Sequence, residues 1–240
     1  MPRRNVPRSE PAAGPEARLD ALVAAAVRVF LRRSYRRVQM ADVARELGVS
    51  PGNLYNYVES KEALFHLVVE RGFGAARPAP APALPVPTPP PGATLALLRR
   101  RLEAEMVTPA LDAALARRRV GDPTGEVAAV VRELYRLVAA RREGIVLIER
   151  SAHDWPELAA LFYQGFRRDL LARLERWIAA RARSGALRAV PDAAVAARFV
   201  NESIAWFAMH RQGDLDSKEL DDAACEETVV DLLIHALAAR

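Results

Sequence analysis

A short segment near the N-terminus, residues 50–58, carries side chains that a plain surface helix would not select. It reads SPGNLYNYV, and at helical spacing Leu54 and Val58 face inward. An ordinary exposed helix favours Glu, Lys, Ala or Arg, which are better helix formers and keep a surface soluble. The positions left on the outer side or at its edges are Gly52, Asn53, Tyr55, Asn56 and Tyr57. A requirement other than helix stability therefore selects these residues.

The residue types on this outer side could contact double-stranded DNA. An Asn amide can bond N6 and N7 of adenine, a Tyr hydroxyl can bond a phosphate, and glycine lets the backbone approach a groove closely. The positions behind them have helix-turn-helix spacing: Ala44 admits the second helix, Gly48 forms the turn and Leu54 holds the second helix. The segment therefore predicts a DNA-reading helix.

Lys61 supports a DNA contact from the next helix along the chain. A cation in the first turn of a helix is disfavoured by the helix dipole, whereas a helix start is a good place to hold a phosphate. The spacing of Ala44 and Gly48 alone would equally suit a purely structural helical hairpin. The polar face and the local charge, 12 Lys and Arg against 8 Asp and Glu in residues 1–74, favour the DNA interpretation.

Four short helices are expected to position this surface. Helical spacing predicts the first two at 15–33 and 40–47, and Gly48 supplies a left-handed position that ends the second. Ser50 and Pro51 start the third helix as N-cap and first helical residue, and Ser60 caps the fourth. No alternating strand pattern occurs, so we expect an all-α fold.

Composition limits the class of protein. The chain has 240 residues, 51% apolar, and a net charge of +5, which permits a polyanionic partner without establishing one. Cys225 is the single cysteine, so an intrachain disulfide is impossible and a reducing compartment is the default. No apolar run approaches the roughly 18 residues that would span a bilayer. We expect a cytoplasmic protein with no membrane partner.

Beyond these patterns, residues 40–64, MADVARELGVSPGNLYNYVESKEAL, resemble the DNA-binding domain of the tetracycline-repressor (TetR) family of bacterial transcriptional regulators. The Gly-Val-Ser turn, the Leu-Tyr pair and the Ser-Lys-Glu-Ala-Leu start of the fourth helix carry the resemblance, which extends over about 18–69. It implies a homodimer whose N-terminal domains read a palindromic operator. The C-terminal domains would dimerise and bind a small molecule that releases the DNA, most often to relieve repression.

The resemblance also implies roles for single residues. Tyr55, Tyr57 and Lys61 would contact phosphates, and the residues at or near base edges would be Gly52, Asn53 and Asn56. Gln39 and Ser50, at the starts of the second and third helices, complete the predicted DNA-binding set. The chain departs from the family pattern at Val38 and Gln39, where Thr or Ser is usual, and at Val58, where Phe is usual.

The predicted domain organisation follows from these segments. We expect a disordered basic arm over 1–15, the helix-turn-helix domain over 16–76, a proline-rich linker over 77–91, and a helical effector-binding and dimerisation domain over 92–240. Eight of the fifteen linker residues are proline, which excludes helix and central strand. Such a segment has no internal hydrogen bonds and little rigidity, so it would transmit a movement poorly. We therefore expect effector signals to pass through contacts of the fourth helix instead. In the last domain helices are expected over 93–118, 125–141, 144–151, 155–184, 192–211 and 221–239.

Two of these helices, 155–184 and 192–211, are apolar on more than one side. A subunit interface would explain this pattern, and so would a single thick core. Aromatic and methionine side chains of the C-terminal domain could line an effector pocket, although such residues are more often core. The candidate pocket residues are Met106, Tyr135, Phe162, Phe166 and Trp206.

Catalysis finds little support in the sequence. The four His residues are scattered and show no metal-ligand spacing with Cys or carboxylates, and neither a phosphate-binding glycine loop nor a nucleophile motif occurs. We therefore expect no enzyme, no cofactor and no metal. The alternative function is an all-α module that binds or sequesters a small molecule and carries a vestigial DNA-binding domain. Retention on mixed-sequence DNA that falls steeply with salt would separate the two.

Overall fold

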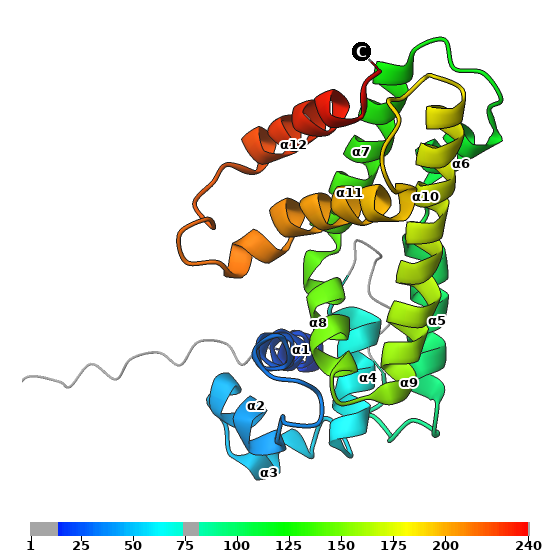
Figure 1. Ribbon diagram of the computed structural model, residues 1–240. Coiled ribbons are helices and arrows are strands. Elements are labelled where there is room, and N and C mark those ends of the chain that lie inside the picture. Colours follow the sequence, from blue (N-terminus) through cyan, green and yellow to red (C-terminus); the bar gives the residue numbers. More distant parts are fainter. Residues whose placement is uncertain (1–13, 74–81, 240) are drawn as a thin grey trace, which may run out of the picture. The chain divides into compact units, whose positions relative to one another are not determined.

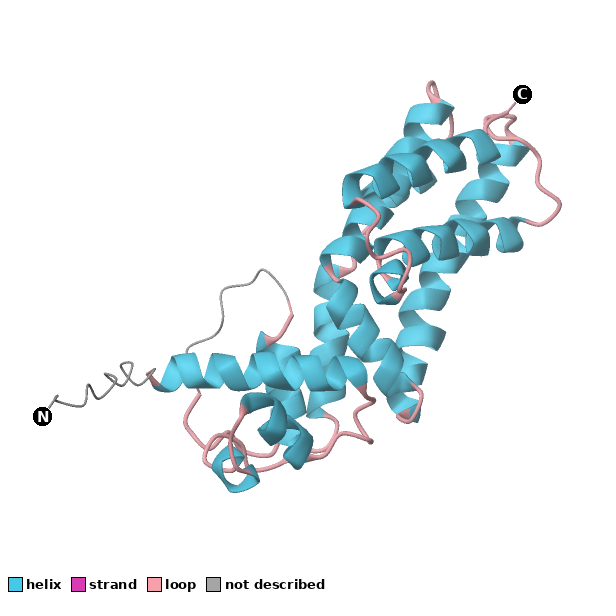
Figure 2. Cartoon of the chain, turned by 90° about the vertical axis from the view of Figure 1, so that its left-hand side faces the viewer, coloured by secondary structure: helices cyan, strands magenta, loops and turns pink. Residues whose placement is uncertain are grey.

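The structure is a computed structural model that describes residues 14–73 and 82–239. The chain divides into an N-terminal unit, Met1–Thr94, and a C-terminal unit, Leu95–Arg240. Figure 2 shows helices and loops in the described part of the chain, which confirms the predicted all-α fold. Strand-like pairing within the described ranges is limited to two isolated bridges, Val58 with Val86 and Leu187 with Ala238. The predicted basic arm lies almost wholly outside the described residues.

The N-terminal unit contains the helices that the sequence predicted. They are α1 (Pro15–Arg32), α2 (Met40–Leu47), α3 (Pro51–Leu54) and α4 (Lys61–Arg71). Helix α1 packs against both α2 and α4, and α2 packs against α3. At the centre the ring of Phe30 meets the ring of Phe65 edge-on, with 5.1 Å between centroids, and both are fully buried. This core fixes α3 on the outside of the unit.

Local chemistry sets the ends of these helices. Gly48 has φ of 77°, the left-handed conformation in which glycine carries no steric penalty, and it ends α2 as predicted. Ser60 caps α4, because its hydroxyl accepts the backbone N–H of Ala63 at 3.1 Å. Ser50 occupies the N-cap position of α3, but its side chain accepts no capping bond. Helix α3 is also short, and residues 55–57 continue as turns.

The proline-rich segment is more than a linker where the structure describes it. Val86 accepts the N–H of Glu59 at 3.0 Å and donates its own N–H to the carbonyl of Tyr57 at 2.8 Å. Thr88 adds two bonds, from its N–H to the carboxylate of Glu59 and from its hydroxyl to Ser60, both at 2.8 Å. Val86–Thr88, within the segment expected to join two domains, thus bind the chain that follows α3. We call Val86–Thr88 the strap.

The C-terminal unit is a helical bundle (Figure 1). The expected helix 93–118 is interrupted over 106–108, because Pro109 cannot continue a helix and disfavours helical geometry in the residue before it. The expected helix 155–184 begins with a short α-turn and includes a π-helical stretch. The elements are α5 (Ala93–Glu105), α6 (Pro109–Ala116), α7 (Pro123–Ala140), α8 (Arg142–Ala152), α9 (Pro156–Ala159), η1 (Ala160–Arg167), α10 (Arg168–Arg183), α11 (Ala193–Ala208), η2 (His210–Gly213) and α12 (Asp222–Leu237).

The core of this unit lies where α11 crosses α7 and α10 (Figure 1). Trp177 is fully buried there, and its indole N–H donates to Glu126 at 2.9 Å. Arg181 pairs with the same carboxylate at 2.5 Å and also bonds the carbonyls of Ala114 and Arg117. This buried pair, in which all three guanidinium nitrogens of Arg181 are hydrogen-bonded, fixes α6, α7 and α10 relative to one another.

Candidate functional site

The predicted DNA-reading residues lie together on the outer side of α3 and the turns after it. Gly52, Asn53 and Asn56 are exposed and Tyr55 is 50% exposed, whereas Leu54 is fully buried beneath them. Tyr57 is half-buried, and its carbonyl is held by the strap. A Cβ built on Gly52 meets nothing within 4 Å, so the face is open at its N-terminal end. The arrangement is an exposed polar face above the buried side chain of Leu54.

Gln39 and Ser50, the other two residues predicted from helix starts, are also exposed. Gln39 is the N-cap of α2, and its backbone N–H donates to the carboxylate of Asp42 at 3.0 Å. Next to it, Arg36 and Arg37 are exposed and form no ion pair within the described ranges. They are further candidates for phosphate contacts.

Lys61 is half-buried and has partners inside the protein. Its ammonium donates to the carbonyls of Val38 at 3.2 Å and Arg36 at 3.4 Å, and it lies 4.8 Å from the centroid of the Tyr35 ring. The hydroxyl of Tyr35 in turn donates to Glu62 at 3.0 Å. Burial and this neighbouring carboxylate raise the pKa of Tyr35, so the phenol stays neutral. Lys61 thus ties the start of α4 to the turn before α2.

We therefore expect Lys61→Ala to lower protein stability as well as DNA affinity. Loss of the two carbonyl bonds should reduce the free energy of unfolding by about 1 kcal/mol. Loss of one phosphate contact should lower the magnitude of the salt slope by about one unit. Urea denaturation and salt titration measure the two effects. Lys218, 49% exposed and paired only with the adjacent Glu219, gives the control Lys218→Ala. Equal stability of the two variants would contradict the carbonyl contacts.

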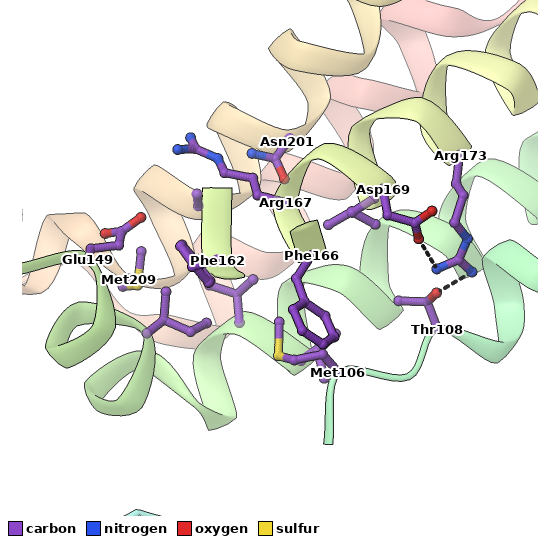
Figure 3. Close-up of a pocket in the computed structure, with 15 residues that line it drawn as sticks. Met106, Thr108, Glu149, Phe162, Phe166, Arg167, Asp169, Arg173, Asn201 and Met209 are labelled. Atoms are coloured by element: carbon purple, nitrogen blue, oxygen red, sulfur yellow. Dashed lines mark hydrogen bonds and ion pairs between the residues drawn. The ribbon is translucent and has the colours of Figure 1, made fainter. Parts of the chain in front are cut away.

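A cavity of about 100 Å³ lies in the C-terminal unit between α8, η1, α10 and α11 (Figure 3). Three of the five predicted pocket residues line it, namely Met106, Phe162 and Phe166. The other lining residues are Thr108, Leu137, Val138, Ile145, Glu149, Arg167, Asp169, Leu170, Arg173, Asn201, Ala205 and Met209. The cavity is mainly apolar, with polar groups from several elements around it, as small-molecule sites commonly are.

Tyr135 and Trp206 do not line this cavity, in contrast to the prediction. Tyr135 is buried in the core, where its hydroxyl lies 3.4 Å from the carbonyl of Phe207. Trp206 lies on the outer side of α11, 37% exposed, with its ring edge-on to Phe207. Aromatic residues at helical spacing look alike in sequence whether they face core, cavity or solvent, so the pattern could not distinguish them.

The charged groups at the cavity differ in their partners. Arg167 pairs with Glu202 at 2.6 Å. Arg173 donates to Thr108 at 2.7 Å and pairs with Asp112. Glu149 lies opposite His210, with 3.9 Å between carboxylate and imidazole, and burial raises the pKa of this carboxyl. Both guanidinium groups therefore already form ion pairs with acids, whereas Glu149 has no basic group within hydrogen-bond distance in the described residues.

Comparison with known proteins supports the fold and the N-terminal domain. Residues 22–68, which span most of α1 to α4, match the family described as bacterial regulatory proteins, tetR family. AibR, solved in complex with isovaleryl coenzyme A and operator DNA, is 18% identical with a TM-score of 0.53, covering 90% of this chain and 98% of that chain. The ketosteroid regulator KstR2 of Mycobacterium tuberculosis is 14% identical with a TM-score of 0.55, covering 93% and 96%.

A TetR-family regulator from Chloroflexus aurantiacus is 13% identical with a TM-score of 0.54, covering 95% of this chain and 96% of that chain. At such identities these structures show a common fold. A search of curated proteins found no match. Among the described helices none has the length and apolar character of a membrane span. The helix-turn-helix unit over residues 22–68 therefore matches the tetR family of bacterial regulatory proteins, and the chain shares its fold with solved tetR-family regulators over nearly its whole length.

Proposed function

We propose that this protein is a cytoplasmic repressor that binds a palindromic operator as a homodimer and leaves it when a small molecule occupies the cavity. The observation that carries the proposal is the polar face of α3 above buried Leu54. Asn53 and Asn56 can bond base edges, while Tyr55, Tyr57 and Lys61 can bond phosphates. The exposed Gly52 leaves room for the backbone to approach the groove.

Exposed apolar side chains on α11 and α12 support the dimer. Val195, Phe199 and Trp206 are 67%, 61% and 37% exposed, and their spacing places them on one face of α11. Leu232, on α12, which packs against α11, is 60% exposed as well. Large apolar side chains gathered on neighbouring helices mark an interaction surface. A second copy of the same face would cover them in an isologous contact.

The strap offers a route by which a change in the C-terminal helices could reach the DNA-reading face. Thr88 and Val86 bind the backbone and side chains of Tyr57, Glu59 and Ser60, and α5 begins at Ala93, a few residues later. A shift of the start of α5 would therefore pull on residues next to the reading face through hydrogen bonds. This is a second candidate route beside the contacts of the fourth helix that the sequence led us to expect.

Val86→Pro tests the strap, because proline has no N–H to donate to the carbonyl of Tyr57. The loss of one such bond, about 1 kcal/mol, should weaken operator binding roughly five-fold by loosening the turn after α3. Ala83→Pro also removes a backbone N–H, at an exposed position outside the bridge. Electrophoretic mobility shifts with both variants provide the comparison. Unchanged affinity in Val86→Pro would show that the strap does not order the reading face.

The salt dependence of DNA binding distinguishes this proposal from the alternative, a sequestering module with a vestigial DNA-binding domain. A regulator that neutralises several phosphates loses affinity linearly in log K against log salt. The purified protein should therefore show a steep negative slope on mixed-sequence duplex DNA, and tighter binding to a selected sequence. Absence of any salt-dependent retention would favour the sequestering module.

A further inference from the structure

Glu149 is the one acid at the cavity whose burial is not explained by a close partner within the described residues. Its side chain is 19% exposed, and its ion pair with His210 spans 3.9 Å, which is too long for a hydrogen bond. In Figure 3 it lies beside Met209 at one end of the cavity, while Arg173 and Thr108 lie at the other. Glu149 is half-buried, and its carboxylate accepts no hydrogen bond within the described residues, so a donor group that reached it there would be favoured.

The arginines at the cavity, in contrast to Glu149, already have partners of opposite charge. An incoming anion would share Arg167 with Glu202 and Arg173 with Asp112, so each arginine has an acidic partner already. An incoming cation finds the carboxylate of Glu149 open to it. The electrostatics of the cavity thus favour a ligand with a positive group over one with a carboxylate or phosphate.

The rest of the lining suits an apolar body. The sticks of Figure 3 place Phe166 next to Met106, with Phe162 closer to the Glu149 end. Aromatic faces attract cations, and a methionine thioether adapts to irregular apolar shapes. The side chains that line the cavity are thus mainly apolar along its length, with an acidic group at one end.

We propose that the cavity binds an amphiphilic amine, with its apolar body between Phe162, Phe166 and Met106 and its ammonium group on the carboxylate of Glu149. The proposal rests on the proposed function, since it names the chemical class of the effector. An ammonium group supplies both the opposite charge and the hydrogen-bond donors that Glu149 lacks.

The titration of Glu149 provides a first test. Its pKa is raised mainly by burial, and the charged groups that face it from neighbouring elements are His210, Arg167, Glu202 and His153. Because the pKa is higher in the folded than in the unfolded state, stability is lost as pH rises through the interval between the two values. Gln cannot ionise, so Glu149→Gln should raise Tm more at about pH 8 than at about pH 5. A loss of stability at both would mean that Glu149 is a structural residue.

Ligand class is tested by isothermal titration of the full-length protein with three matched probes: 3-phenylpropylamine, 3-phenyl-1-propanol and 3-phenylpropanoate. The amine should bind at least tenfold more tightly than the carboxylate. Glu149→Gln should weaken amine binding about tenfold and change alcohol binding less than twofold. Glu143→Gln, an exposed change on the same helix, should leave all three unchanged. Equal or tighter binding of the carboxylate, no binding of the amine, or an amine affinity independent of Glu149 would overturn the proposal.

Release of DNA is measured separately, with labelled operator and the same amine. Release by the amine that is weakened in Glu149→Gln supports both the ligand class and the effector role. Binding of the amine without release supports the ligand class and contradicts the effector role in the proposed function. Release that Glu149→Gln leaves unchanged contradicts the proposed contact between the ammonium group and Glu149, and leaves the proposed function standing.

Discussion

Gly52→Glu is expected to abolish specific DNA binding while leaving the protein folded. Gly52 is exposed on the face of α3, and a side chain added there meets no atom within 4 Å. A carboxylate at the second position of a helix is also favourable for the helix itself. Facing phosphates and base edges, however, the same charge should cost about 3 kcal/mol, roughly a 100-fold loss of affinity. Fluorescence anisotropy with labelled operator measures the loss.

Gly121→Glu is the matched control. Gly121 lies in the loop between α6 and α7, is exposed, and likewise offers open space to an added side chain. The two variants therefore share residue change and net charge, and they differ in position. Both should keep the melting temperature of the parent protein. If both variants lowered DNA affinity equally, the effect of Gly52→Glu would come from the added negative charge and not from its position on α3.

Phe199→Glu is expected to convert the dimer into a monomer and to lower operator affinity by about 100-fold. Phe199 is 61% exposed at the middle of the apolar face of α11, between Val195 and Trp206. Burying a carboxylate there in the partner contact would carry the cost of an unpaired charge. A monomer contacts only one half-site, so the gain from simultaneous binding of two is lost. Sedimentation velocity and operator titration give the two results.

Leu215→Glu makes the comparable change outside this face. Leu215 is 88% exposed in the loop between η2 and α12, where a charge meets water in any state of assembly. It should remain dimeric and bind operator as the parent protein does. A monomeric parent protein at micromolar concentration, or a dimeric Phe199→Glu variant, would show that the exposed residues of α11 serve another contact.

The DNA-reading face could be predicted from the sequence because local chemistry determines it. Gly48 makes its turn by its own backbone freedom, Ser60 caps the helix that it precedes, and the apolar spacing of α2 and α3 decides which side is buried. Each of these effects acts over a few residues. The helix break over 106–108 is local too, and Pro109 was the available signal.

The features that the sequence did not reveal depend on contacts between distant residues. Lys61 bonds Val38, and Val86 bonds Tyr57 and Glu59, in each case across more than twenty positions of the chain. The position of Glu149 beside His210 likewise depends on how α8 meets the end of α11. Periodicity describes one helix at a time, so it cannot say which residues of different helices meet at a cavity.

The most direct test of the central claim is selection of bound sequences from random double-stranded DNA by the full-length protein. The account predicts enrichment of a palindromic sequence with two equal half-sites, because a two-fold dimer presents two copies of α3 to the major groove. The half-sites should be separated by about one helical turn or a multiple of it. Enrichment should disappear with Gly52→Glu and persist with Gly121→Glu. A pool that stays random, or an enriched sequence without two-fold symmetry, would contradict an operator read by a homodimer.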